Sequence, residues 1–158
     1  MDYKVLMQQA ILLAKETAIK GDVPVGALVV DDAGNVVGQG ANLREQENDP
    51  TAHAEIVAIR NAAKKLGNYR LNGLTMVATL EPCGMCAGAI AQSRIKRLVF
   101  GSFDEKYGAV GSVWDLLRDS RAIYKPEVLS GVLENECALL LSDFFVDKRR
   151  PKSPSPDL

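Results

Sequence analysis

Segments with the periodicity of a helix alternate with segments of strand character along most of the chain, and this alternation limits the fold more than any other feature. Helical spacing of apolar residues predicts helices over residues 1–20, 51–66, 83–93, 113–118 and 134–150. Strand character marks residues 25–30, 36–37, 74–80, 97–100 and 128–132, with a hairpin turn at 31–35. Helices that alternate with strands predict a three-layer α/β domain around a mostly parallel or mixed sheet.

The length and charge of the chain limit the classes of protein to which it can belong. With 158 residues it matches one domain, which we expect over residues 1–150, followed by a frayed Pro- and Ser-rich tail over 151–158. Its net charge of −1 argues against a disordered chain and against a protein that is basic overall, but leaves room for a local basic patch. Because neither an apolar membrane span nor a signal peptide is visible, we expect a soluble, cytoplasmic protein without membrane contact.

Cysteine and histidine are scarce enough to be informative. The chain has 3 cysteines and 1 histidine, which excludes a fully paired disulfide framework and any site that needs two histidines of one chain. The histidine lies in His53-Ala54-Glu55, and two of the cysteines lie in Pro82-Cys83-Gly84-Met85-Cys86. Both motifs stand at the start of a predicted helix.

The two motifs together predict a metal site. Cys83 and Cys86 are three residues apart at a helix start, so both sulfurs can face one way, and the helix N–H groups favour thiolates. If the helix that begins near His53 meets them, one imidazole and two thiolates surround one point, a donor set that suits Zn²⁺. Glu55 is placed to stand beside a metal-activated water and move protons.

Three other interpretations of these residues remain open. Either motif taken alone is compatible with an ordinary surface helix or a packed one. Cys137 would complete a structural Cys₃His zinc site, although its place on the apolar side of the last helix predicts a core residue. A thioredoxin-like dithiol is the third, and it leaves His53 and Glu55 without a role.

The motifs match the pattern H-x-E…P-C-x-x-C, so the chain resembles the zinc-dependent cytidine/deoxycytidylate deaminase superfamily and, within it, the bacterial deaminases that act on tRNA adenosines. The resemblance runs from the first helix to about Arg150. It includes Val23-Pro24-Val25-Gly26-Ala27, Asn42, residues 86–90, Phe100-Gly101, residues 108–112 and residues 141–145. It implies a cytidine-deaminase-like fold, with a five-stranded mixed sheet flanked by helices, and a homodimer.

The resemblance also implies a reaction. His53, Cys83 and Cys86 would hold one Zn²⁺ per subunit, and Glu55 would be the general acid/base. Water activated at the zinc would attack C6 of adenine, Glu55 would carry protons, and ammonia would leave. The product would be inosine at the wobble position of a tRNA anticodon.

Six further residues are implied as substrate contacts. They are Asn42, Val25, Ala54, Asp104, Phe145 and Arg149. Asn42 would hydrogen-bond the flipped base, since its side chain carries a donor and an acceptor in one plane; the alternative is an Asn that caps its own loop. Asp104 would lie near a nucleotide beside the target, and Phe145 and Arg149 near the anticodon loop.

Two basic clusters offer contacts for the anticodon stem-loop of tRNA. They are Arg94, Lys96 and Arg97, and Lys148, Arg149, Arg150 and Lys152. In the alternative interpretation these are solvated helix ends, and Phe144 and Phe145 belong to the core. The chain departs from the family in Val146-Asp147, where a basic residue often follows the Phe pair, and in an acidic, aromatic 102–107 loop.

Two other functions compete with the leading one. A free-base or nucleoside deaminase, acting on guanine or cytosine, would close its pocket with C-terminal residues, whereas a long helix that ends in Phe-Phe and bases favours an open site facing RNA. A non-catalytic, zinc-stabilised RNA-binding module would have no need of Glu55.

Overall fold

The computed structural model describes residues 1–150, so the expected tail over 151–158 lies outside the described residues. The helices are α1 (Tyr3–Ile19), α2 (Arg44–Glu47), α3 (Ala54–Leu66), α4 (Gly84–Gln92) and α5 (Glu134–Arg149). The strands are β1 (Gly26–Val30), β2 (Val36–Ala41), β3 (Thr75–Leu80), β4 (Arg97–Ser102) and β5 (Glu127–Leu129).

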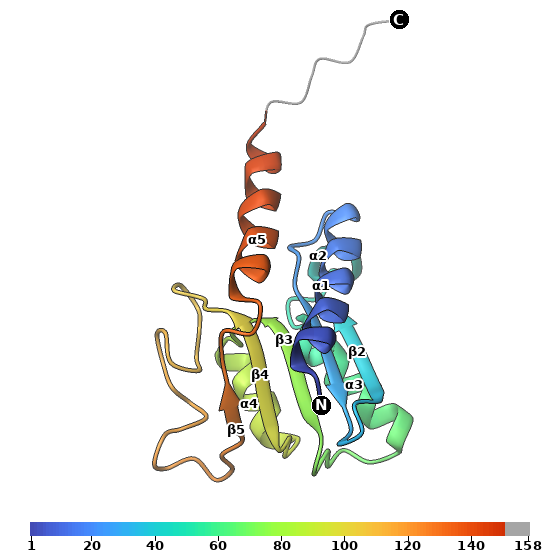
Figure 1. The fold of residues 1–158 in the computed structure, drawn as a ribbon, viewed down its shortest axis with the longest axis vertical. Coiled ribbons are helices and arrows are strands. Elements are labelled where there is room, and N and C mark those ends of the chain that lie inside the picture. The colour runs from blue at the N-terminus through green and yellow to red at the C-terminus, as the bar shows by residue number, and fades with distance from the viewer. Residues whose placement is uncertain (151–158) are drawn as a thin grey trace, which may run out of the picture.

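The five strands form one mixed sheet in the order β2-β1-β3-β4-β5. β1 is antiparallel to both β2 and β3, while β4 is parallel to β3 and β5. Helices α1 and α5 cover one face of the sheet and α3 and α4 cover the other (Figure 1). The predicted three-layer fold with a five-stranded mixed sheet is therefore confirmed.

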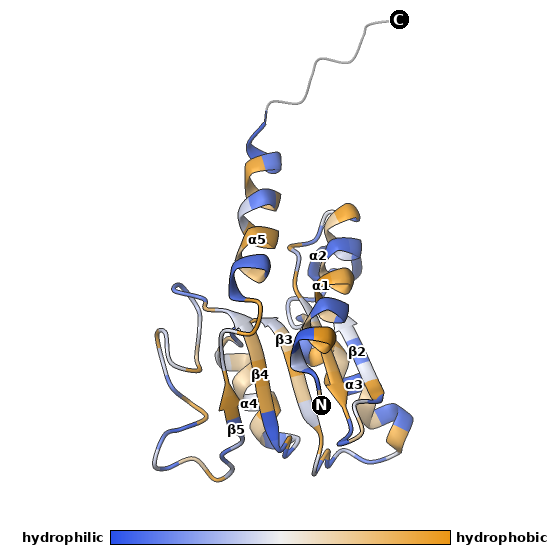
Figure 2. Cartoon of the chain, in the orientation of Figure 1, coloured by the Kyte–Doolittle hydropathy of each residue, from blue (hydrophilic) through white to orange (hydrophobic). Residues whose placement is uncertain are grey.

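Alternating strand residues supply two cores, one on each face of the sheet, as the period of two in a strand requires. Ala27 and Val29 face α3 and α4, whereas Leu28 and Val30 face α1 and α5. Figure 2 shows the apolar character of the central strands and, in contrast, alternating polar and apolar residues along α5, which projects past the end of the sheet. Among residues 1–150, no helix combines the length and the apolar character that a membrane crossing needs.

Helix α3 packs unusually close to β2. A Cβ atom at Gly38 would lie 2.5 Å from the backbone nitrogen of Ala62, and one at Gly40 would lie 2.5 Å from the carbonyl oxygen of Ala54. Only glycine at these two strand positions permits this approach, because any Cβ atom there would overlap the helix. The side of α3 that packs against these glycines accordingly carries a stripe of buried alanines: Ala54, Ala58 and Ala62.

Three details differ from the sequence-based prediction. The helix expected over 113–118 is absent: this segment forms turns and one isolated bridge, between Val110 and Asp115. Residues 44–47, for which the sequence pattern predicted no helix, form the short α2, whose Glu45 and Gln46 backbone N–H groups donate to the buried Asp22 carboxylate. β5 ends at Leu129, ahead of Gly131, which has a φ of 80° that an extended strand does not allow.

Candidate metal and substrate site

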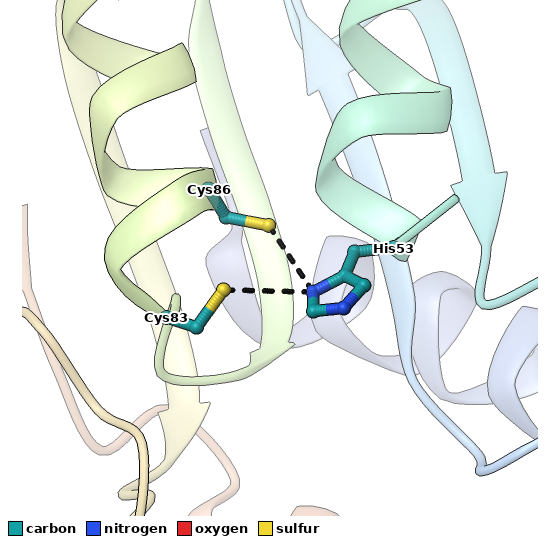
Figure 3. A group of neighbouring side chains, drawn as sticks. All are labelled: His53, Cys83 and Cys86. Carbon is teal, nitrogen blue, oxygen red and sulfur yellow. Dashed lines mark hydrogen bonds between the residues drawn. The ribbon is translucent and has the colours of Figure 1, made fainter. Parts of the chain in front are cut away.

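His53, Cys83 and Cys86 come from the starts of two helices at the same edge of the sheet. His53 is the N-cap residue of α3, Cys83 is the N-cap residue of α4, and Cys86 lies in the first turn of α4. The Nδ1 atom of His53 lies 3.5 Å from the Sγ atom of Cys83 and 3.5 Å from that of Cys86. Figure 3 shows this ring nitrogen facing both sulfurs across the gap between the helices.

The donor set fits a zinc ion. Ligand atoms of the three residues all lie within 4.8 Å of one another, and within residues 1–150 they form the one group of three or more His, Cys, Asp or Glu side chains that converge in this way. One imidazole and two thiolates are ligands that Zn²⁺ accepts, and three protein ligands leave a fourth position for water or substrate. The metal-site prediction from the two motifs is therefore met by the geometry.

Cys137 takes no part in this cluster. Its side chain is 1% exposed and belongs to the core on the α1 and α5 face. It packs against β4, where a Cβ atom at Gly101 would lie 2.3 Å from the Cys137 sulfur. The structural Cys₃His interpretation is wrong, and the expected core role of Cys137 is confirmed.

The two thiols near His53 behave as a pair that shares a proton. A hydrogen bond from the Cys86 thiol, together with one from His53, lowers the pKa of Cys83 to about 4. The same hydrogen bond, with burial and the nearby Glu55 carboxyl, raises the pKa of Cys86. Cys83 is consequently a thiolate at neutral pH before any metal binds.

Glu55 lies inside the protein beside these ligands. Its side chain is 4% exposed, and its carboxyl group is within hydrogen-bonding reach of the Cys86 thiol. Burial, opposed in part by the charge of His53, raises the pKa of Glu55 to about 7. A carboxyl group with a pKa near neutrality exchanges protons in both directions at physiological pH, as a general acid/base must.

His53 and Cys83 line a cleft of about 930 Å³, and Cys86 is fully buried beside them. Five of the six expected substrate contacts line this cleft: Val25, Asn42, Ala54, Asp104 and Phe145. Arg149, the sixth, is exposed near the end of α5 and is not among the lining residues. Elements from both ends of the chain thus meet around one opening.

Asn42 is 6% exposed, and its amide already has partners within the protein. Its Nδ2 group donates to the carbonyl oxygen of Val23 at 3.1 Å, and its Oδ1 atom accepts the N–H of Arg44 at 3.2 Å. Asn42 therefore caps its own loop, as the alternative interpretation expected. A second amide hydrogen and a second lone pair remain available for a base.

The two phenylalanines of α5 are more exposed than a core interpretation requires. Phe145 is 44% exposed and lines the cleft, whereas Phe144 is half-buried and packs edge to face against it, with ring centroids 5.5 Å apart. The ammonium group of Lys148 lies 4.8 Å from the centre of the Phe144 ring. An exposed aromatic ring at the cleft is suited to stack on an unpaired base.

The basic clusters lie in different places. Arg97 begins β4, at the opposite end of the sheet from the cleft, and its guanidinium binds Glu127 and the hydroxyl of Tyr3. Arg94 and Lys96, which precede it, also do not line the cleft. Lys148 and Arg149 continue α5 beyond Phe145, Arg150 is its C-cap residue, and Lys152 lies outside the described residues.

Two charged residues of the cleft are not predicted from the sequence motifs. Arg44 lines the cleft from α2, a helix that the sequence pattern does not predict. Glu81 also lines it, although only 1% of its side chain is exposed. The signal for Glu81 was its place between the predicted strand and Pro82-Cys83, where an acidic residue at the end of an apolar strand is unusual.

Comparisons with known proteins agree with this geometry. Residues 1–102 match the model of the cytidine and deoxycytidylate deaminase zinc-binding region. A tRNA-specific adenosine deaminase of Haemophilus influenzae is 52% identical over 147 residues, which cover 93% of this chain and 85% of that protein. One of Bacillus subtilis is 47% identical over 146 residues, 92% of this chain and 90% of that protein.

A solved structure supports the same relationship. It comes from a study of A-to-I editing by tRNA:A34 deaminases at the wobble position of transfer RNA. The two chains share 42% sequence identity with a TM-score of 0.82, over 85% of this chain and 97% of the other.

Proposed function

This chain belongs to the cytidine and deoxycytidylate deaminase family, and from that we propose that it hydrolyses adenosine to inosine at the wobble position of a tRNA anticodon. The observation that carries the proposal is the His53, Cys83 and Cys86 donor set beside the buried Glu55, at the base of an open cleft. The identity to tRNA-specific adenosine deaminases supports adenosine in tRNA as the substrate.

Each part of the site has a task in this reaction. Zinc held by His53, Cys83 and Cys86 would supply a Lewis acid that lowers the pKa of water. Glu55 accepts a proton from the water that adds to C6 and delivers it to N1 of adenine. Glu55 then takes the second proton from the new C6 hydroxyl group and carries it to the amino group, so that the C6–N6 bond breaks as the C6=O bond forms and ammonia leaves.

The cleft walls would hold the flipped nucleotide. Val25 and Ala54 line the inner part of the cleft next to Glu55, and the free hydrogen-bonding capacity of Asn42 suits a purine edge. Asp104 and Phe145 stand on opposite segments, the 103–107 loop and α5, where nucleotides on either side of the target would lie. Arg149 would meet the RNA backbone further along α5.

Helix α5 favours RNA over a free base as the substrate. It contributes Ala138, Leu141 and Phe145 to the cleft wall and then runs on past the end of the sheet (Figure 1). A wall that continues outward with an exposed aromatic ring and basic residues suits a nucleotide that remains attached to its strand. Two hypotheses are less favoured: deamination of free guanine or cytosine, and RNA binding without catalysis.

We further propose that the chain acts as a cytoplasmic homodimer and that residues 1–150 are a single domain. Four large apolar side chains, one at the start of α4 and three in the segment between β4 and β5, support self-association: Met85, Val113, Trp114 and Leu116, which are 39%, 44%, 58% and 43% exposed. Sedimentation equilibrium tests this; a monomer at micromolar concentration would contradict it.

The function is tested by incubating the zinc-loaded protein with an adenosine-containing anticodon stem-loop and, separately, with adenine, adenosine, guanine and cytosine. Inosine and ammonia are measured in each reaction. We expect inosine and equal ammonia from the stem-loop. Deamination of a free base without turnover of the stem-loop would contradict the proposal.

A further inference from the structure

Glu81 is a buried carboxylate that faces four donors from a single loop. Its Oε1 atom accepts the N–H of Asp104 at 3.2 Å and the hydroxyl of Ser112. Its Oε2 atom accepts the N–H groups of Val110 and Ser112, each at 3.1 Å. Residues 104–112, here called the cleft loop, therefore converge on one side chain from both of their ends.

The cleft loop is also joined to the segment that carries the metal ligands. The N–H of Ala109 donates to the carbonyl oxygen of Pro82 at 2.9 Å, and Gly108 forms an isolated bridge with Cys83. Gly108 lies so near the carboxylate that a Cβ atom there would be 2.2 Å from Oε2 of Glu81. Glu81, Pro82 and Cys83 thus contact the loop in succession.

The loop bears residues that line the cleft. Asp104, whose N–H is bound by Glu81, also accepts the N–H groups of Lys106 and Tyr107 on its Oδ1 atom, so the first turn of the loop is organised around it. Without Glu81, the N–H groups of Asp104, Val110 and Ser112 would lose their acceptor. Charge-assisted hydrogen bonds of this kind are stronger than neutral ones.

We propose that Glu81 is a positioning residue that holds the cleft loop in register with Cys83, so that the loop contacts the nucleotide beside the target base. This inference rests on the proposed function. Glu81 acts through Asp104 and its neighbours, since its four hydrogen bonds all go to the cleft loop. Its loss changes how well the stem-loop binds, while the metal ligands and Glu55 keep their places.

Glu81→Gln is the most specific test. The amide oxygen of glutamine can take the place of Oε2 and accept the backbone N–H groups of Val110 and Ser112. The amide nitrogen, in the place of Oε1, can then donate to the hydroxyl oxygen of Ser112. Only the N–H of Asp104 is left facing another donor. We expect faster amide exchange in a peptide covering 103–107, a KM for the stem-loop raised about tenfold, and a kcat changed less than about threefold.

One further variant and a control are measured in the same assays. Ser112→Ala removes the hydroxyl donor, but the Glu81 carboxylate still accepts the three backbone N–H groups. The KM of Ser112→Ala should therefore rise less than that of Glu81→Gln. Glu16→Gln makes the same chemical change at an exposed residue of α1, and KM and amide exchange match the parent protein. Zinc content stays at one per chain throughout.

Gly108→Ala covers the case in which Glu81→Gln does not fold. The added Cβ displaces the loop while the carboxylate remains, and the same faster exchange and higher KM are expected. Unchanged exchange in residues 103–112 of both variants would overturn the inference, as would zinc loss or a fall in kcat with KM unchanged. If the parent protein does not turn over the stem-loop, the proposed function fails, and exchange alone then decides whether Glu81 holds the loop.

Discussion

His53 and Cys83 are both N-cap residues, of α3 and α4, and the Nδ1 atom of one lies 3.5 Å from the Sγ atom of the other. Neither side chain makes a capping hydrogen bond to the backbone of its own helix. A Ser or Asp at such a position would stabilise its helix by about 1 kcal/mol. Both helices go without that cap, and the two side chains are directed at a common point instead.

Cys83→Ser separates the two roles of this position. Serine is a favoured N-cap but a poor zinc ligand, so we expect zinc binding and deamination to be lost. The free energy of unfolding of the metal-free protein should stay equal or rise by up to about 1 kcal/mol. Metal analysis and urea denaturation measure both. Cys137→Ser is the matched control and should keep its zinc; loss of zinc in the control alone would contradict the assignment.

The pKa of Cys83 predicts an unusual reactivity of the metal-free protein. Because that pKa is lowered to about 4, Cys83 is already a thiolate at about pH 6 and loses this form only as the pH falls through about 4. Alkylation by iodoacetamide should therefore be nearly independent of pH above about 6, whereas an ordinary thiol reacts progressively faster up to about pH 8.5. Peptide mapping identifies the modified residue. The description of a shared proton would be contradicted if the alkylation rate of Cys83 still increased steeply above about pH 7, or if iodoacetamide modified Cys86 preferentially.

Much of this site was predictable because its signals are local. The alternation of helices and strands, the helix starts at His53 and Cys83, and their spacing all lie within short stretches of sequence. What sequence reasoning missed depends on residues far apart in the chain. The alanine stripe of α3 follows from Gly38 and Gly40 on β2, and the role of Glu81 depends on donors in the loop that begins at Asp104.

The segment 113–118 shows a different cause of error. Its apolar residues have helical spacing, but the backbone N–H groups of Val113 and Trp114 donate to Gly108, and that of Leu116 donates to Ala109. These bonds turn the chain back on the loop, which leaves Leu117 1% exposed in the core. Tertiary contacts outweigh local propensity in so short a segment.

Gly40→Ala should move α3 and, with it, the His53 ligand. The added Cβ would lie 2.5 Å from the carbonyl oxygen of Ala54, so the helix must shift. We expect the free energy of unfolding to fall by about 1–3 kcal/mol and zinc affinity to weaken. Gln39→Ala, on the exposed face of the same strand, should change stability by less than about 0.5 kcal/mol. Equal effects of the two substitutions would show that close packing against α3 is not the cause.

Phe145→Ala should weaken RNA recognition through α5. Phe145 lines the cleft at 44% exposure, and stacking of one base on an aromatic ring contributes about 1–3 kcal/mol. We expect kcat/KM for the stem-loop to fall about tenfold or more, with zinc content and stability unchanged. Val146→Ala is the control, since Val146 is 51% exposed and does not line the cleft. A similar loss in both variants would point to helix stability instead of stacking.

The central claim is that this site deaminates one adenosine of an anticodon and that Glu55 carries the protons. The most direct measurement is single-turnover inosine formation, mapped by position, in an anticodon stem-loop with adenosine at the wobble position and elsewhere in the loop. The zinc-loaded protein should produce inosine at the wobble position alone, and zinc-loaded Glu55→Gln should be slower by about 10²–10⁴-fold. Inosine at several loop positions, or full activity of Glu55→Gln with its zinc in place, would contradict the account.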